Sequence, residues 1–219
     1  QNEIEERLRR AGAVFTTHSE EEMIQITAES LREGKAVGWH QGRMEYGPRS
    51  LGCRSILADP RSPTIQRQLN LKVKFRESFR PFAPSVLAEE VDQWFEFAGE
   101  SPYMLMVANV ISGRQIPLTT DQKRLFGIDL LNVPRSTIPA VTHVDYSARI
   151  QTVHRETNPL FHRLITAFRE LTGCPVLVNT SFNVRGEPIV CTPEDAFQCL
   201  LGTEIDLLAS GVASQHSLR

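Results

Sequence analysis

Side chains that could hold an anion gather in three short segments of this sequence. The first, residues 42–61, holds four arginines together with three glycines and two prolines. Arginine forks match the oxygens of phosphate and carboxylate, a lysine adds a compact point charge, and hydroxyl and amide groups can share one ligand. This combination predicts binding of a polyphosphate and stabilisation of negative charge at a phosphoryl centre. The candidate residues are Arg43, Arg49 and Arg54, then Lys74, Arg76 and Arg80, and lastly Ser181, Asn183 and Arg185.

The distribution of charge favours a small anionic ligand. Residues 43–80 contain nine Lys and Arg but three Asp and Glu, a net charge of +6, whereas the whole chain carries −2. A domain that binds a long nucleic acid is usually basic as a whole, so a basic segment in an acidic chain indicates a phosphate-sized target. Charge counting alone leaves a solvated basic surface as an equal alternative.

Neither the cysteines nor the histidines have the spacing of metal ligands. The four cysteines form no Cys-x-x-Cys pair and the six histidines show no ligand pattern, so we expect no metal in this chain and reduced thiols. His40, beside the first arginine segment, is either a substrate contact or a structural residue. Walker, dinucleotide, hydrolase and zincin motifs are absent. With no apolar run of about 18 residues, we expect a cytoplasmic protein without membrane contact.

Helices and strands alternate along the sequence, which indicates the α/β class in one domain. Ser19 and Glu22 have the spacing of a capping box, Gly34 ends the helix that follows, and Thr192 with Pro193 gives another helix start. Residues 112–139 predict a long excursion with at most one short helix. The expected helices span residues 3–10, 19–33, 63–71, 89–95, 158–172 and 192–201. The expected strands span residues 13–15, 35–40, 55–58, 85–87, 103–110, 140–144 paired with 149–154, 175–178, 188–190 and 205–209.

The candidate residues form a set distributed along the sequence, and the expected elements position two parts of it. Ser181 and Asn183 follow the buried strand 175–178, and α/β sheets bind ligands beyond their strand ends. Lys74 and Arg76 are two residues apart, so in an extended segment both side chains project from the same face.

Four stretches of the sequence resemble one enzyme family. Residues 42–52 (GRMEYGPRSLG), 54–61 (RSILADPR), 75–84 (FRESFRPFAP) and 179–183 (NTSFN) are similar to the signature of the C-terminal domain of NodU/CmcH-type carbamoyltransferases. The resemblance covers roughly residues 20–212. Ser50 and Cys53 depart from the family pattern, in which alanine and asparagine are common.

The resemblance implies a YrdC-like fold, an α/β open twisted mixed sheet with flanking helices, as a single domain over residues 1–219. It also implies an O-carbamoyltransferase reaction with ATP, Mg²⁺ and carbamoyl phosphate. Carbamoyl phosphate is cleaved to carbamate, which attacks the α-phosphorus of ATP to give carbamoyl-adenylate and pyrophosphate. A Kae1-like N-terminal domain that holds iron, absent from these residues, then moves the carbamoyl group to an acceptor hydroxyl and is the expected partner.

Residue roles follow from the same resemblance. YrdC-like proteins carry a Lys-x-Arg and a Ser-x-Asn signature around the nucleotide, and residues 74–76 and 181–183 match them. Lys74 and Arg76 are therefore the expected catalytic residues. The other expected contacts, to nucleotide, carbamoyl group and phosphates, are Arg43, Arg49, Arg54, Arg80, Ser181, Asn183 and Arg185.

Two other classes of function stay open at this point. The basic concavity of a YrdC-like fold could bind double-stranded RNA, although the acidic remainder of the chain argues against nucleic acid. The chain could also be a docking or scaffold domain whose arginine segment packs onto an N-terminal half. Its start at Gln1 instead of Met indicates an excised piece of a longer polypeptide. A homodimer is a further partner state to test.

Overall fold

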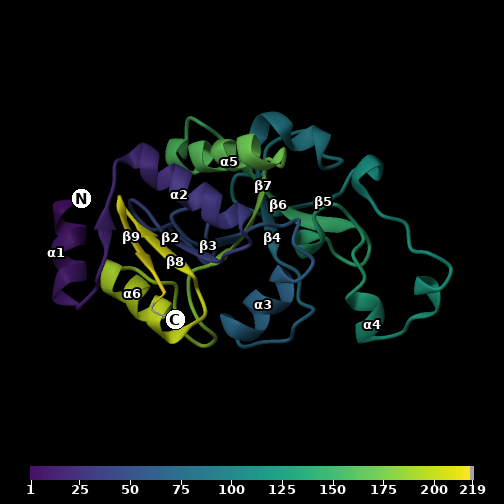
Figure 1. Ribbon diagram of the computed structural model, residues 1–219. Coiled ribbons are helices and arrows are strands. Elements are labelled where there is room, and N and C mark those ends of the chain that lie inside the picture. The colour runs from purple at the N-terminus through teal and green to yellow at the C-terminus, as the bar shows by residue number, and fades with distance from the viewer. Residues whose placement is uncertain (218–219) are drawn as a thin grey trace.

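A nine-stranded open sheet forms the centre of the computed structural model, which describes residues 1–217 (Figure 1). The strand order is β1-β9-β8-β2-β3-β7-β4-β6-β5. The β2–β8 and β4–β6 pairs are parallel and the remaining pairs are antiparallel, so the sheet is mixed. The strands are β1 Thr16–Thr17, β2 Val37–His40, β3 Arg54–Ala58, β4 Ala83–Leu87, β5 Met106–Asn109, β6 Ser147–Val153, β7 Val176–Ser181, β8 Leu207–Ser210 and β9 Ala213–His216.

Helices flank this sheet on both sides (Figure 1). The helices α2 and α5 pack against each other on one side, and α3 and α6 lie on the other. The predicted α/β class, with an open mixed sheet and flanking helices, is therefore confirmed. The α-helices are α1 Asn2–Arg10, α2 Glu20–Arg32, α3 Ile65–Lys72, α4 Ile128–Leu131, α5 Pro159–Thr172 and α6 Pro193–Gly202, and the 3-10 helices are Ala88–Gln93, Ser112–Arg114, Gln122–Arg124 and Pro139–Val141.

Helix ends lie where local chemistry predicts them. At the start of α2, the Ser19 hydroxyl accepts from the Glu22 amide at 3.2 Å while the Glu22 carboxylate accepts from the Ser19 amide at 2.8 Å. Thr192 and Asp195 form a second capping box at α6. Each box satisfies two backbone donors that a helix start leaves unpaired.

The predicted hairpin between residues 140–144 and 149–154 is wrong. Pro139 begins a 3-10 helix, and the hydroxyls of Ser136 and Thr142 bind the backbone of Ile138 in place of a strand partner. These local side-chain bonds compete with the sheet ladder. The strand β6 pairs with β4 and β5 instead.

The sheet edge also differs from expectation. The apolar residues 188–190 form no strand, since Pro188 has no amide hydrogen and the Val190 amide donates to the carbonyl of Phe182, just beyond the end of β7. A first strand was expected at residues 13–15, but β1 begins later, at Thr16. The polar strand β9 was not predicted. It pairs with β8 through a turn in which Gly211 has φ of +58°.

The central strands β4, β6 and β7 carry four polar side chains on one face of the sheet. In β7, Asn179 is opposite Ala83 of β4, and Ser85 of β4 is opposite Gln151 of β6. Because side chains alternate along a strand, Asn179, Ser85, Gln151 and Arg149 share one face of the sheet.

Candidate functional site

The loop between β2 and β3 folds around the carboxylate of Glu45. Its Oε1 accepts hydrogen bonds from the backbone amides of Leu51 at 2.7 Å, Cys53 at 2.8 Å and Arg54 at 3.3 Å. Charge-assisted bonds of this kind are stronger than neutral ones, so one side chain fixes the path of the loop. The loop thereby brings Arg49 and Ser50 to the face of the sheet that carries Arg149.

Glycine is required at position 52 of this loop. Gly52 has φ of +107°, and a Cβ placed there would lie 2.2 Å from the ring of Phe161 in α5. The Gly52 carbonyl also accepts from the indole of Trp39 at 3.0 Å. The loop backbone at Gly52 therefore contacts both α5 and β2, and these contacts fix the position of the loop above the sheet.

Arg54, one of the predicted ligand contacts, binds the protein backbone in this structure. Its side chain is buried, and its guanidinium makes five hydrogen bonds to four backbone carbonyls, at 2.8 to 3.2 Å. A guanidinium has five N–H groups, so none is left for a ligand. The acceptors are the carbonyls of Gln41, Gly42, Cys53 and Cys191.

The ammonium of Lys74 lies in a cage of oxygen atoms. It donates to the backbone carbonyl of Ser181, to the Asn183 carbonyl at 3.0 Å, to Asn183 Oδ1 at 2.8 Å and to Ser181 Oγ at 3.2 Å. The Lys-x-Arg and Ser-x-Asn motifs therefore lie in direct contact through the side chains of Lys74, Ser181 and Asn183. Burial and the nearby charge of Arg76 lower the pKa of Lys74 to about 7. Within residues 1–217, Lys74 forms no salt bridge to a carboxylate.

The segment after α3 is shaped by the buried side chain of Asn70. Its Oδ1 accepts from Arg76 Nε at 2.6 Å, and its Nδ2 donates to the carbonyls of Ser78 and Arg80. The segment is not extended as expected, because Phe75 has φ of +47°. Arg76 also stacks 5.0 Å from the ring centroid of Phe82, and burial together with the charge of Arg80 lowers its pKa to about 10.

Two adjacent cavities bring most of the predicted residues together. One, of about 270 Å³, contains Lys74, and the other, of about 190 Å³, contains Arg49 and Arg149. Arg76, Arg80 and Ser181 line both, so the two form one groove. The first is lined by Lys74, Arg76, Glu77, Arg80, Ser181, Asn183, Val184, Arg185 and Gly186. The second is lined by Pro48, Arg49, Ser50, Arg76, Arg80, Pro81, Phe82, Ala83, Met104, Arg149, Asn179, Thr180 and Ser181.

The groove is strongly positive. Six cationic side chains line it, against the single carboxylate of Glu77 among the described lining residues. Cations crowded without counterions disfavour one another, and burial with the charges of Arg49 and Arg80 lowers the pKa of Arg149. An anionic ligand would relieve this repulsion, so the groove is the candidate anion site.

Arg149, Ser50 and Asn179 are groove residues that the sequence did not reveal. Arg149 Nε, Ser50 Oγ and Asn179 Oδ1 are buried and have no hydrogen-bond partner. They are three of the six such side-chain atoms found in residues 1–217, and all three belong to the smaller cavity. Unpaired buried polar atoms are costly, and their concentration in one cavity indicates a polar ligand.

The remaining predicted residues lie in different settings. Arg185 lines the larger of the two cavities and donates to the Phe75 carbonyl at 3.3 Å. Arg43 is exposed and lines neither cavity. His40 is buried between Ser210 Oγ at 2.9 Å and the Cys191 carbonyl at 3.3 Å, and burial lowers its pKa to about 4. His40 is therefore a structural residue.

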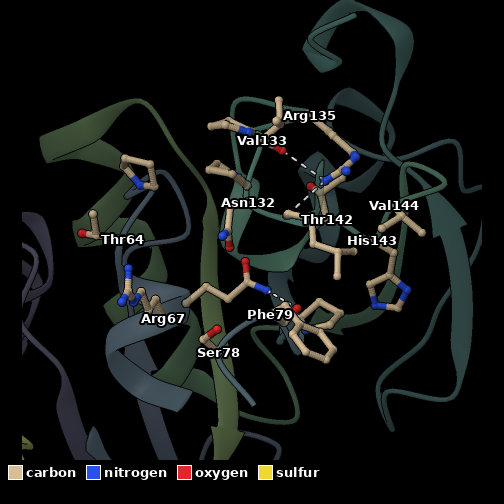
Figure 2. Close-up of a pocket in the computed structure, with 16 residues that line it drawn as sticks. Thr64, Arg67, Ser78, Phe79, Asn132, Val133, Arg135, Thr142, His143 and Val144 are labelled. Atoms are coloured by element: carbon tan, nitrogen blue, oxygen red, sulfur yellow. Dashed lines mark hydrogen bonds between the residues drawn. The ribbon is translucent and has the colours of Figure 1, made fainter. Parts of the chain in front are cut away.

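A third cavity, of about 410 Å³, contains none of the predicted residues (Figure 2). In Figure 2, Thr64 and Arg67 of the α3 end lie on one side of it and Arg135 lies on another. Arg135 is occupied, because it donates to the carbonyls of Leu130, Leu131 and Val133. Within residues 1–217, no unpaired buried side-chain atom belongs to its lining. The chemistry therefore favours the arginine groove.

Residues 1–217 contain neither a cluster of metal-ligating side chains nor a membrane-spanning helix. No group of three or more His, Cys, Asp or Glu side chains is placed to hold a metal ion in that part of the chain. None of its helices is both long enough and apolar enough to cross a bilayer.

Comparison with known proteins identifies the family. The model of the carbamoyltransferase C-terminus matches residues 28–214. The uncharacterized protein sll1178 of Synechocystis is 61% identical over 90% of this chain and 32% of its own length. Nodulation protein NolNO of Sinorhizobium fredii is 44% identical over 84% of this chain and 25% of its own. The 3'-hydroxymethylcephem-O-carbamoyltransferase of Amycolatopsis lactamdurans is 39% identical over 74% of this chain and 26% of its own.

These relatives are much longer than the present sequence. The chain spans between a quarter and a third of the length of each. The match nevertheless covers most of the chain, including every residue of the groove. The chain therefore belongs to the carbamoyltransferase C-terminus family.

Proposed function

We propose that this chain is the part of an O-carbamoyltransferase that binds ATP and carbamoyl phosphate and forms carbamoyl-adenylate. Family membership supports the reaction class, and one relative is named as an O-carbamoyltransferase. The observation that carries the proposal is the shared wall of two cationic cavities, formed by Arg76, Arg80 and Ser181. Two anionic substrates that react with each other would lie side by side under the same positive charge.

Each cavity receives one substrate. The cavity with Lys74 takes the triphosphate, and the cavity with Arg49 and Arg149 takes carbamoyl phosphate. Water cleaves carbamoyl phosphate to carbamate and inorganic phosphate. A carbamate oxygen then forms a bond to the α-phosphorus of ATP, the bond from that phosphorus to the bridging oxygen breaks, and pyrophosphate leaves with the electron pair. Carbamoyl-adenylate is the second product.

Charge stabilisation is the contribution of the groove residues. Arg76 and Arg80 lie at the shared wall, next to the negative charge that develops between the entering oxygen and the departing pyrophosphate. Ser181 and Asn183 take up the three N–H groups of Lys74 before any ligand arrives, so Lys74 acts on the phosphates through its fixed positive charge and needs no reorganisation during the reaction. Lys74 and Arg76 are accordingly the proposed catalytic residues.

Mg²⁺ fits the groove as an ion carried by the nucleotide. It prefers one or two carboxylates together with water and phosphate oxygens. Glu77 is the one carboxylate among the described residues of the two cavities. The remaining ligands of the Mg²⁺ ion would therefore be phosphate oxygens and water. When bound, the ion would neutralise charge on the pyrophosphate.

Transfer of the carbamoyl group to an acceptor hydroxyl is assigned to sequence outside this chain. The relatives have two to three times as much additional sequence, where a Kae1-like domain with iron would lie. We place the reaction in the cytoplasm, where ATP is available.

The test is release of pyrophosphate from ATP by the 219-residue chain. We expect release that depends on carbamoyl phosphate and is lost in Lys74→Met. Lys72→Met is the matched control, because Lys72 pairs with Glu204 and lines neither cavity. If the unaltered chain binds neither ATP nor carbamoyl phosphate, the proposal is wrong. A steep salt dependence of RNA affinity would favour the nucleic-acid alternative instead.

A further inference from the structure

The amide oxygen of Asn179 is an unusual feature of the smaller cavity. Asn179 is 1% exposed and lines the cavity, and its Oδ1 has no hydrogen-bond partner. The cations around it are donors that suit an anion, whereas Oδ1 is an acceptor and would repel phosphate oxygens. A ligand that satisfies the whole cavity must therefore carry an N–H or O–H donor as well as negative charge.

The orientation of this amide is fixed by a chain of hydrogen bonds. Gln151 Nε2 donates to the Leu51 carbonyl at 2.9 Å, so Gln151 must present its oxygen to Asn179. Asn179 Nδ2 then donates to Gln151 Oε1 at 3.0 Å and to Ser85 Oγ at 3.0 Å. Turning the amide over would set two carbonyl oxygens against each other.

Ser85 completes the chain and leaves no alternative arrangement. Its hydroxyl donates to Gln151 Oε1 at 2.6 Å and accepts from Asn179. The side-chain donors of Ser85, Gln151 and Asn179 are therefore committed to one another and to Leu51, and the acceptor Oδ1 of Asn179 stays unpaired. A fully satisfied network behind one orphaned atom preorganises that atom for a ligand.

We propose that Asn179 determines substrate specificity by accepting a hydrogen bond from the amide nitrogen of carbamoyl phosphate. This inference rests on the proposed function and adds a reason why the site rejects other acyl phosphates. Acetyl phosphate has a methyl group at the same position, which would leave Oδ1 buried and unpaired. Sites built to bind an N–H group discriminate strongly against analogues that lack it.

The experiment compares two stable ligands that differ in that group alone. Phosphonoacetamide carries an NH₂ group where acetonylphosphonate carries a methyl group, and both keep the carbonyl and the phosphonate. Titration calorimetry on the full 219-residue chain should show that the amide binds about tenfold or more tightly than the ketone. In Asn179→Ala the ratio should fall to about one, with the affinity for the ketone preserved.

A matched asparagine provides the control. Asn109→Ala changes an exposed side chain that lines neither cavity, and it should keep the preference for the amide. Equal binding of both ligands by the unaltered chain would overturn the inference while leaving the proposed function intact, and this comparison needs no variant to fold. An equal loss of both ligands in Asn179→Ala would assign Asn179 a structural role only and also overturn it. Failure of the unaltered chain to bind either ligand would overturn the carbamoyl phosphate site itself.

Discussion

Binding of an anion in the groove should make Lys74 take up a proton. Burial and the charge of Arg76 lower the pKa of Lys74 to about 7. A bound triphosphate beside the ammonium favours the charged form and returns the pKa toward its ordinary range. Below pH 7 the group is already charged and binding needs no proton. Above pH 7 it must first be protonated, so the affinity for ATP falls as the pH rises.

The size of the effect follows from the fraction of uncharged lysine. Between about pH 6 and about pH 8 this fraction rises from about one tenth to about nine tenths, which weakens binding about tenfold. At the pKa itself about half a proton is taken up for each ligand bound. The large effect depends on the burial of Lys74 and on the nearby charge of Arg76.

Titration calorimetry with ATP measures both quantities. Lys74→Met has no titratable group at this position, so the ratio of its affinity to that of the unaltered chain removes the titration of the nucleotide. The advantage of the unaltered chain should shrink about tenfold across the pH window, and heats in buffers of different ionisation enthalpy should report the proton uptake. A ratio that stays constant with pH, or release of protons on binding, would refute the reasoning.

Three further outcomes follow from the loop and the smaller cavity. Gly52→Ala should lower the free energy of unfolding by about 2–5 kcal/mol, because its Cβ would meet Phe161 at 2.2 Å in a backbone conformation that L residues avoid. The midpoint of thermal unfolding should fall by about 5–15 °C, and an unchanged midpoint would contradict the packing described. Glu45→Ala should leave three backbone amides unpaired, lower the free energy of unfolding in denaturant by about 1–3 kcal/mol and weaken phosphonoacetamide binding. A variant as stable as the parent would show that the loop does not depend on the carboxylate. Arg149→Met should weaken phosphonoacetamide binding about 10–100-fold with little change in thermal stability, since Arg149 Nε has no partner and Nη2 makes only a long contact of 3.8 Å to Met104 Sδ. Equal affinity in calorimetry would remove Arg149 from the site.

Elements with a local chemical signal could be predicted from the sequence. Ser19 with Glu22 marks the start of α2, and Gly173, which has φ of +72°, ends α5. Strand β9 has no such signal, because the polar residues of Ala213–His216 join the sheet only through pairing with β8 and β1. Its position depends on tertiary partners that a single sequence does not display.

The site residues that belong to sequence motifs could be predicted, whereas those that only the fold brings to the groove could not. Lys74 and Ser181 stand in recognisable motifs, and the structure brings them into contact. Arg149 lies in a strand with alternating polar and apolar residues, a pattern that a half-buried strand explains without any function. Arg49 and Arg54 are five residues apart in one loop, yet one lines the groove and the other braces the backbone. That difference comes from the path of the loop around Glu45.

The most direct measurement is a crystal structure of the chain with phosphonoacetamide and an ATP analogue that cannot be cleaved. The account predicts the triphosphate beside Lys74 and Arg76 and the phosphonate beside Arg49 and Arg149, with the amide nitrogen within hydrogen-bond distance of Asn179 Oδ1. Occupation of the cavity in Figure 2 by either ligand, with the arginine groove empty, would contradict it.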